Sequence, residues 1–236
     1  MGPFDRRLLR GLTFDIFGTC VDWFTAVARE IRAIAPEADA EGLAVEWRRR
    51  YRPALARVTS GEREWAKLDV LHRESLEELL PSFHLERLTS SEQERLVFAW
   101  HRLDPWPDAA AGLELLRRSY VVATLSNGNV SLLVDLIRHA GLRFDAVLSA
   151  EVARSYKPAP AVYSMALDLL DLRPEQALMV AAHADDLEAA AAVGMRTAFV
   201  SRPAEWGGRQ HFQPPPRGHF DIQAADFADL ARQLGA

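Results

Sequence analysis

The stretch Leu12-Thr13-Phe14-Asp15-Ile16-Phe17-Gly18-Thr19 decides the fold and gives the first sign of a reactive site. It opens with apolar residues typical of a buried strand, and the carboxylate of Asp15 follows just before a glycine turn. This order predicts a strand over residues 11–18 that brings Asp15 to the end of a sheet. A carboxylate in such a place can act as a covalent nucleophile.

The composition is typical of a soluble globular protein. The 236 residues are 49% hydrophobic and 26% charged, which is enough for a sizeable core. The formal net charge of -5 predicts no general attraction to nucleic acid or to an anionic membrane surface. No segment has the length and hydrophobicity of a membrane span or of a signal peptide. We therefore expect a cytoplasmic protein with neither nucleic acid nor membrane among its partners.

Two local features have ordinary structural explanations. The single cysteine, Cys20, excludes an internal disulfide and indicates a reducing compartment. Its closeness to Asp15 allows a nucleophile, but a lone cysteine is more often a small buried apolar residue. The basic run Arg48-Arg49-Arg50, with Arg52, lies in a helix-like stretch. Its members would point in different directions, so most are expected on a solvated face.

Residues 21–103 have a helical pattern. Apolar residues recur at helical spacing in three groups, and a fourth helix is expected to open with the capping-box pattern Ser91-Glu92-Gln93-Glu94. The aromatic members are expected to belong to the core. The three groups are Phe24, Val27, Ile31 and Ile34; Leu43, Trp47, Tyr51 and Leu55; and Trp65, Leu68, Leu71 and Leu79.

Strands and helices alternate from Pro105 onward. Strands are expected over residues 120–125, 144–149, 177–182 and 196–201. Helices are expected over residues 130–140, from Pro158, from Asp185 and over residues 224–234, and a long loop is expected over residues 203–218. Gly141 and Gly194 stand where helices would end. The alternation predicts an α/β protein with a Rossmann-like parallel-sheet core and helices on both faces.

The first strand is separated from the rest of its sheet by a helical insertion of roughly eighty residues, too long for a simple loop. We predict a core domain of residues 1–20 and 104–236 and a helical cap domain of residues 21–103. An insertion directly after Asp15 should lie above the carboxyl ends of the strands, where ligands bind in an open parallel sheet. The cap should therefore act as a lid.

Polar residues follow four of the predicted strands, at or just beyond their ends. Asp15 follows the first strand, Ser126-Asn127 the second, Lys157 the loop after the third, and Asp186 the fourth. Each has an alternative explanation: Ser126-Asn127 starts a good turn, and Asp186 would favour a helix N-terminus. Because the topology gathers these strand ends, we expect a single site.

The chain resembles the haloacid dehalogenase superfamily and, within it, the metal-independent type II L-2-haloacid dehalogenases. The resemblance extends from Leu12 to about Trp206. The motifs that carry it are Asp15-Ile16-Phe17-Gly18-Thr19, Trp47-Arg48, Ser126-Asn127-Gly128-Asn129, Tyr156-Lys157-Pro158 with Tyr163, and His183-Ala184-Asp185-Asp186.

This resemblance implies a two-step reaction. Asp15 would attack the halogen-bearing carbon of a short (S)-2-haloacid, expel halide and form an ester, whose hydrolysis yields an (R)-2-hydroxy acid. Lys157 would keep Asp15 ionised, Thr19 would orient it, and Asp186 would orient or deprotonate the water. The residues that the resemblance assigns to substrate and halide binding are Phe17, Arg48, Ser126, Asn127, Tyr163 and His183.

The resemblance also implies that no metal or other cofactor is required. Phosphatases of the superfamily carry a second Asp where Phe17 stands, because their leaving oxygen needs a proton and a halide does not. They also hold magnesium with a later Asp, and that position falls on Ala182 here. A haloacid carries a single negative charge, which Lys157 and Arg48 could balance.

Three positions depart from the best-known dehalogenase pattern. Ala181 stands where a Ser is common, His183 where an Asn is common, and Asp185 replaces a bulkier residue. His183 could hydrogen-bond Asp186 or the water, could narrow the pocket in favour of haloacetates, or could be a structural histidine. A homodimer is what the family suggests.

Two other functions remain open from the sequence. A magnesium-dependent phosphatase would use Asp185 and Asp186 as metal ligands. A non-catalytic protein would keep the fold and bind a small acid without turning it over. The joint presence of Asp15, Lys157, Arg48 and Asp186 favours an enzyme over the non-catalytic protein.

Overall fold

The computed structural model describes residues 4–209 and 212–236, and a six-stranded parallel sheet forms its centre. The order of the strands is β5-β4-β1-β6-β7-β8. Their bounds are β1 Gly11–Phe14, β4 Val121–Ser126, β5 Ala146–Ser149, β6 Ala177–Ala181, β7 Arg196–Val200 and β8 Ile222–Ala224. β1 lies between β4 and β6, so the residues that follow it reach the middle of the sheet edge.

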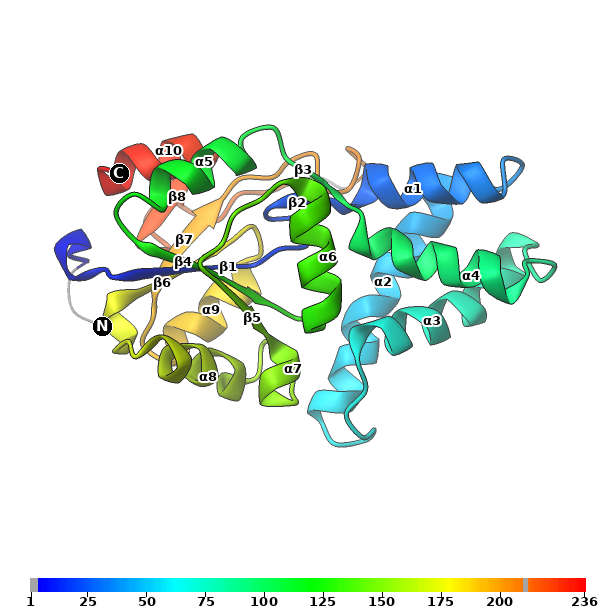
Figure 1. The fold of residues 1–236 in the computed structure, drawn as a ribbon, viewed down its shortest axis with the longest axis horizontal. Coiled ribbons are helices and arrows are strands. Elements are labelled where there is room, and N and C mark those ends of the chain that lie inside the picture. The colour runs from blue at the N-terminus through cyan, green and yellow to red at the C-terminus, as the bar shows by residue number, and fades with distance from the viewer. Residues whose placement is uncertain (1–3, 210–211) are drawn as a thin grey trace.

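The central strands are apolar because helices cover both faces of the sheet. Every residue of β1, β6 and β7 is buried. α5 (Ala109–Leu116) and α10 (Phe227–Leu234) lie together on one side of the sheet, and α8 (Pro160–Leu170) and α9 (Ala184–Ala192) lie on the other (Figure 1). α6 (Val130–Ala140) and the short α7 (Ala150–Ala153) complete the connections. The predicted α/β class with a parallel sheet is confirmed.

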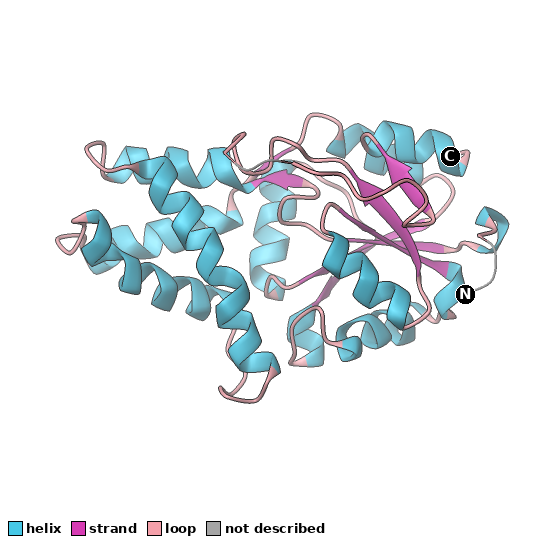
Figure 2. Ribbon diagram, turned by 180° about the vertical axis from the view of Figure 1, so that it is seen from behind, coloured by secondary structure: helices cyan, strands magenta, loops and turns pink. Residues whose placement is uncertain are grey.

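Four helices of the insertion gather at one end of the molecule, beside the sheet (Figures 1 and 2). They are α1 Trp23–Ile34, α2 Ala40–Thr59, α3 Leu68–Leu79 and α4 Ser90–Val97, with short 3-10 turns at Leu80–Phe83 and Phe98–His101. Their core contains the fully buried Trp23, Trp47 and Trp100. The chain enters and leaves through an antiparallel pair, β2 (Val21–Asp22) and β3 (Asp104–Pro105). The domain boundaries expected from the sequence lie beside this pair and stay a prediction.

Several predicted helix starts were misplaced. The capping box of α4 is formed by Thr89 and Glu92, not by the pattern that starts at Ser91. α8 begins at Pro160 rather than Pro158, since a second proline two residues later takes the first-turn position. The last helix begins at Phe227, after an unpredicted strand, β8.

Other elements differ from the prediction in their length or were not predicted. β1 ends at Phe14 rather than at residue 18, because the chain turns at Gly18, whose φ is 86°. α5 was not predicted at all, since its run Ala109-Ala110-Ala111-Gly112 has little hydrophobic periodicity. Gly141 ends α6 in the left-handed conformation, as predicted. Residues 210–211 of the predicted loop lie outside the described residues. Within the described part of the chain, no helix combines the length and hydrophobicity needed to span a membrane.

Candidate active site

A cavity of about 520 Å³ lies between the carboxyl ends of the strands and helix α2. We call the two walls the sheet side and the cap side. The sheet side consists of Asp15, Asn127, Lys157, Pro158, His183, Asp185 and Asp186. The cap side consists of Arg48, Tyr51, Arg52, Leu55, Ala56, Thr59 and Ser60, all on α2 or directly after it.

Asp15 is fixed at the end of the central strand. Its backbone N–H donates to the Val180 carbonyl at 3.0 Å and so extends the pairing of β1 with β6. The Thr19 hydroxyl donates to Asp15 Oδ2 at 2.7 Å, and the backbone N–H of Ala182 donates to that hydroxyl at 3.0 Å. Because the hydroxyl oxygen accepts from Ala182, its proton is directed at the carboxylate. Thr19 is thus placed to orient Asp15.

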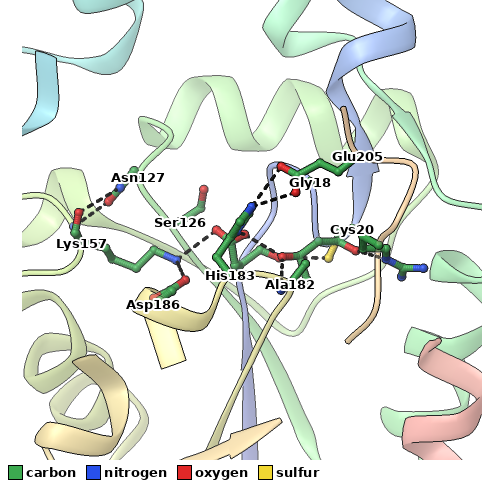
Figure 3. A network of polar contacts seen from close by, with 12 residues as sticks. Gly18, Cys20, Ser126, Asn127, Lys157, Ala182, His183, Asp186 and Glu205 are labelled. Atoms are coloured by element: carbon green, nitrogen blue, oxygen red, sulfur yellow. Dashed lines mark hydrogen bonds and ion pairs between the residues drawn. The ribbon is translucent and has the colours of Figure 1, made fainter. Parts of the chain in front are cut away.

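Lys157 joins the two buried carboxylates of the site. Its Nζ lies 3.0 Å from Asp15 Oδ1 and 2.5 Å from Asp186 Oδ2, and the three side chains are each less than a tenth exposed. Figure 3 shows Lys157 between Asn127 and Asp186. The Asn127 side chain accepts from the Lys157 backbone N–H at 2.7 Å and donates to its carbonyl at 3.4 Å. This pair of bonds holds the lysine loop against the end of β4.

The pKa values of Asp15 and Lys157 depend on their burial and on the charges beside them. Burial raises the pKa of Asp15, but Lys157, His183 and Thr19 outweigh it and hold the pKa well below the usual range. Burial alone would lower the pKa of Lys157, but Asp15 and Asp186 raise it above its ordinary value. At neutral pH the site therefore holds an ionised Asp15 beside an ammonium group.

Asp186 lies in the first turn of α9 and has a different environment. Its Oδ1 accepts from the Tyr163 hydroxyl at 2.6 Å, while Oδ2 accepts from Lys157. Burial raises the pKa of Asp186; Lys157 opposes this, and the neighbouring Asp15 adds to it, so the pKa stands above the usual value. A carboxylate with a raised pKa is a stronger base than an ordinary one.

His183 lies between two carboxylates. Its Nδ1 is 3.2 Å from Asp15 Oδ2, and its Nε2 is 3.0 and 3.1 Å from the two oxygens of Glu205 (Figure 3). Glu205 also accepts from Trp23 Nε1 at 3.0 Å. Burial lowers the pKa of His183, but Glu205 and Asp15 outweigh it and raise the pKa to about 10.

Arg48 is the buried cation of the cap side, whereas Arg52 is largely exposed. Unlike Arg49 and Arg50, which are exposed, Arg48 is buried. Its guanidinium lies over the Tyr51 ring, 4.3 Å from the centroid, and Nη2 is 4.0 Å from Glu205 Oε1. Nη1 is buried with no hydrogen-bond partner among the described residues. A buried guanidinium N–H without a partner is available to an anionic ligand.

Three residues assigned to substrate binding do not line the cavity. Phe17 is buried and packs edge-on against Trp100, with the ring centroids 6.1 Å apart. Ser126 is buried and accepts from the Gly128 backbone N–H at 3.3 Å. Tyr163 is buried and bonds to Asp186. Arg48, Asn127 and His183 do line the cavity, and a substrate contact for any of the six residues stays a prediction.

Sequence reasoning missed Glu205 and Tyr51. Glu205 lies in the loop after the carboxyl end of β7, but it is separated from Val200 by four residues, so the strand-end position that marks Asp15 is only a weak signal for it. Tyr51 was assigned to the core, although it lies one helical turn from Arg48 and shares its face of α2. The sequence also did not reveal that Arg52 of the cap side forms an ion pair with Asp185 of the sheet side, with charged atoms 2.7 Å apart.

The donor set does not fit a magnesium ion. Both oxygens of Asp186 already accept hydrogen bonds, Asp185 is paired with Arg52, and Ala182 offers no side-chain oxygen. The ammonium of Lys157 lies between the carboxylates that a metal would need. In the described ranges, no group of three or more His, Cys, Asp or Glu side chains could hold a metal ion.

The fold is that of a haloacid dehalogenase-like hydrolase, and the model of that family matches residues 9–194. An (S)-2-haloacid dehalogenase of Burkholderia cepacia is 34% identical over 197 residues, which is 82% of this chain and 84% of the relative. The chain belongs to the L-2-haloacid dehalogenases of the haloacid dehalogenase superfamily. The enzymes of this family are hydrolases that act on carbon–halide bonds.

Solved structures agree with this assignment. The crystal structure of a defluorinating L-2-haloacid dehalogenase is 41% identical, covers 100% of both chains and has a TM-score of 0.93. An L-2-haloacid dehalogenase of Xanthobacter autotrophicus with chloropropionic acid covalently bound is 26% identical, covers 97% of this chain and 99% of that one, and has a TM-score of 0.84.

Proposed function

We propose that this protein hydrolyses short (S)-2-haloacids to (R)-2-hydroxy acids and halide through an ester on Asp15. The observation that carries the proposal is the bridge of Lys157 between Asp15 and Asp186, with contacts of 3.0 and 2.5 Å. One cation thereby holds a nucleophile and a candidate base in a single buried site.

In the first step, Asp15 attacks the carbon that bears the halogen. An Asp15–carbon bond forms as the carbon–halogen bond breaks, and the bonding electrons leave with the halide. Attack from the face opposite the halogen inverts the carbon, which gives the (R) product from an (S) substrate. Arg48, with its unpaired Nη1, offers a donor to the departing halide or the substrate carboxylate.

In the second step, water attacks the Asp15 carboxyl carbon. Asp186 takes a proton from the water and returns it to the alkoxide oxygen of the product as the ester bond breaks. Its raised pKa suits this role, and Tyr163 holds one of its oxygens in place. The covalent adduct in the Xanthobacter relative supports a covalent route in this family.

Substrate size is set by the cap side of the cavity. Leu55 and Ala56 present an apolar surface there, which suits the short alkyl group of a haloacetate or a 2-halopropionate. Fluorinated acids belong among the substrates to be tested, since a defluorinating relative shares the fold over its full length. We further propose that the enzyme is a cytoplasmic homodimer, as the family suggests.

The phosphatase alternative is disfavoured by the donor set, because Asp185 and Asp186 are each paired with a cation. The non-catalytic alternative is disfavoured by the burial of Asp15 beside both Lys157 and a candidate base, Asp186, an arrangement that binding of a small acid alone does not require. A generic aryl phosphate with magnesium tests the first alternative, and binding of a haloacid without halide release would revive the second.

The direct test is halide release. Purified protein is expected to release chloride from L-2-chloropropionate and from chloroacetate in excess chelator. Asp15→Asn should abolish release, since the amide is not a nucleophile of comparable strength. Release that needs magnesium, or that survives in Asp15→Asn, would contradict the proposal.

A further inference from the structure

His183 faces oxygen acceptors on both of its ring nitrogens. Nδ1 is 3.2 Å from Asp15 Oδ2, and Nε2 is 3.0 Å from Glu205 Oε1. A neutral imidazole has one N–H, so one of these contacts would set two lone pairs against each other. Only the doubly protonated ring donates to both carboxylates. The geometry therefore defines a charged His183, and its raised pKa agrees.

We propose that Glu205 is a positioning residue that holds His183 as an imidazolium, and that His183 and Thr19 together form the oxyanion hole for hydrolysis of the Asp15 ester. This inference rests on the proposed function and deepens its second step. It gives a role to the histidine that stands where related dehalogenases commonly carry asparagine.

The two oxygens of Asp15 are held differently. Oδ2 accepts from both Thr19 and His183, at 2.7 and 3.2 Å, whereas among the described residues Oδ1 accepts only from Lys157. Oδ1 therefore keeps the freer lone pair and is the attacking oxygen. Oδ2 becomes the carbonyl oxygen of the ester. It gains a full negative charge when water adds to the carboxyl carbon, and it loses that charge when the ester C–O bond breaks and the hydroxy acid leaves.

Thr19 and His183 are already aimed at that oxygen before any charge develops. Donors fixed in this way stabilise the transition state without having to reorganise. A charged donor makes a stronger hydrogen bond to an oxyanion than a neutral amide does. His183 as an imidazolium would thus speed hydrolysis of the ester more than it aids the first attack.

Glu205 packs against the turn at Gly18 that follows the nucleophile Asp15. It is 6% exposed and accepts from Trp23 Nε1. Gly18 has a φ of 86°, and a Cβ added there would collide with the Glu205 carboxylate. Gly18 is therefore required both for the turn and for the close approach of Glu205. The burial of Glu205 and its bond to Trp23 hold its carboxylate in this position.

Glu205 also balances the charge that His183 adds. Burial raises the pKa of Glu205, but His183 and Arg48 outweigh it and lower the pKa below the ordinary value. These six groups then balance: the cations are Arg48, Lys157 and His183, the anions are Asp15, Asp186 and Glu205, and all but the partly exposed His183 are buried. Without Glu205, the imidazolium would lie beside two other cations with only two carboxylates to offset them.

Glu205→Gln tests the inference, because it removes the charge and keeps the size. The pKa of His183, followed by NMR of labelled histidine, should fall from about 10 toward neutrality. Hydrolysis of the ester should slow about tenfold at neutral pH and should gain a falling alkaline limb, since a weaker oxyanion donor remains. The ester should accumulate on the intact protein by mass spectrometry, and kcat and KM should fall together, while kcat/KM, which reports the steps up to ester formation, stays near the wild-type value.

Two further variants separate positioning from packing. Trp23→Phe removes another hydrogen bond of Glu205 but keeps its charge, so the His183 pKa should stay near the wild-type value. His183→Asn should slow ester hydrolysis and, combined with Glu205→Gln, should remove the new alkaline limb. Glu205→Gln with wild-type ester decay and a wild-type pH profile would overturn the inference.

Failure of the proposed function would look different. If wild-type protein released no halide from any haloacid, the proposed function would fail and the oxyanion role with it. The NMR titration would still show whether Glu205 sets the charge of His183. Normal halide release with an unchanged His183 pKa in Glu205→Gln overturns only the inference.

Discussion

The sheet side and the cap side of the cavity differ in how fully their polar atoms are paired. On the sheet side, the charged atoms of Asp15, Lys157 and Asp186 all have partners at 2.5–3.0 Å. On the cap side, Arg48 keeps a buried N–H without a partner among the described residues, next to the apolar Leu55 and Ala56. The difference indicates a division of labour. Under the proposed function, the sheet side is preorganised for chemistry, and the cap side offers a donor to a small anion.

The largest effect is expected from Lys157→Met on the sheet side. Asp15 and Asp186 would then be two buried carboxylates without their cation, so they should share a proton and Asp15 should lose its ionised, aimed state; kcat should fall at least about 10³-fold. The only other lysine, Lys67, is exposed and paired with Glu151, so Lys67→Met is a matched control. Halide release with circular dichroism checks this. Similar losses in both variants would mean a general defect in folding.

A smaller effect is expected from Arg48→Lys on the cap side. Lysine cannot reproduce the stacked, forked donor over Tyr51, so kcat/KM should fall about 10²-fold, with much of the loss in KM. Arg49→Lys, one residue away but exposed, should have no measurable effect. Steady-state kinetics on L-2-chloropropionate separate the two. Equal behaviour of the two variants would contradict the role given to the cap side.

The Tyr163→Phe substitution is expected to shift the pH dependence of activity. The Tyr163 hydroxyl lowers the pKa of Asp186, so its loss should raise that pKa further. A base works when deprotonated, so activity is lost as pH falls through its pKa, and the acid limb should move to higher pH. We expect the acid limb to move by on the order of one pH unit. The loss of activity relative to wild type should therefore be several-fold greater at pH 5.5 than at pH 8. If the acid limb does not move, it reports the titration of a group other than Asp186.

The smallest effect is expected from Leu55→Phe, which narrows the cap side without changing charge. Chloroacetate should be hydrolysed nearly as before, while 2-chlorobutyrate should lose about tenfold in kcat/KM through steric exclusion. The ratio of the two rates is the measurement. A parallel loss on both acids would show that Leu55 supports the site instead of limiting the substrate.

The sheet side could be largely predicted from the sequence, and the cap side could not. Asp15, Lys157 and Asp186 follow strands whose ends a parallel sheet must bring together. Arg48 stands in a run of three arginines, and only the packing of α2 decides which one turns inward, so it was found through resemblance alone. Glu205 was missed because it lies in a long loop with no local periodicity, where its contact to His183 depends on tertiary structure.

The elements of the fold also differ in how far they depend on tertiary structure. The parallel sheet and the helical insertion follow from apolar periodicity, but α5 and β8 do not. α5 begins with three alanines and a glycine, and β8 is only three residues long. Such segments adopt their structure because of the elements they pack against, which a single sequence does not reveal.

Repeated turnover in oxygen-18 water tests most directly whether Asp15 is the covalent nucleophile. Water attacks the carboxyl carbon of the ester, so a heavy oxygen should enter the Asp15 side chain and be found by mass spectrometry of the peptide that contains it. The product should carry label only after that oxygen has been passed on in a later cycle. Label that enters the hydroxy acid in the first turnover, with none in Asp15, would contradict the account.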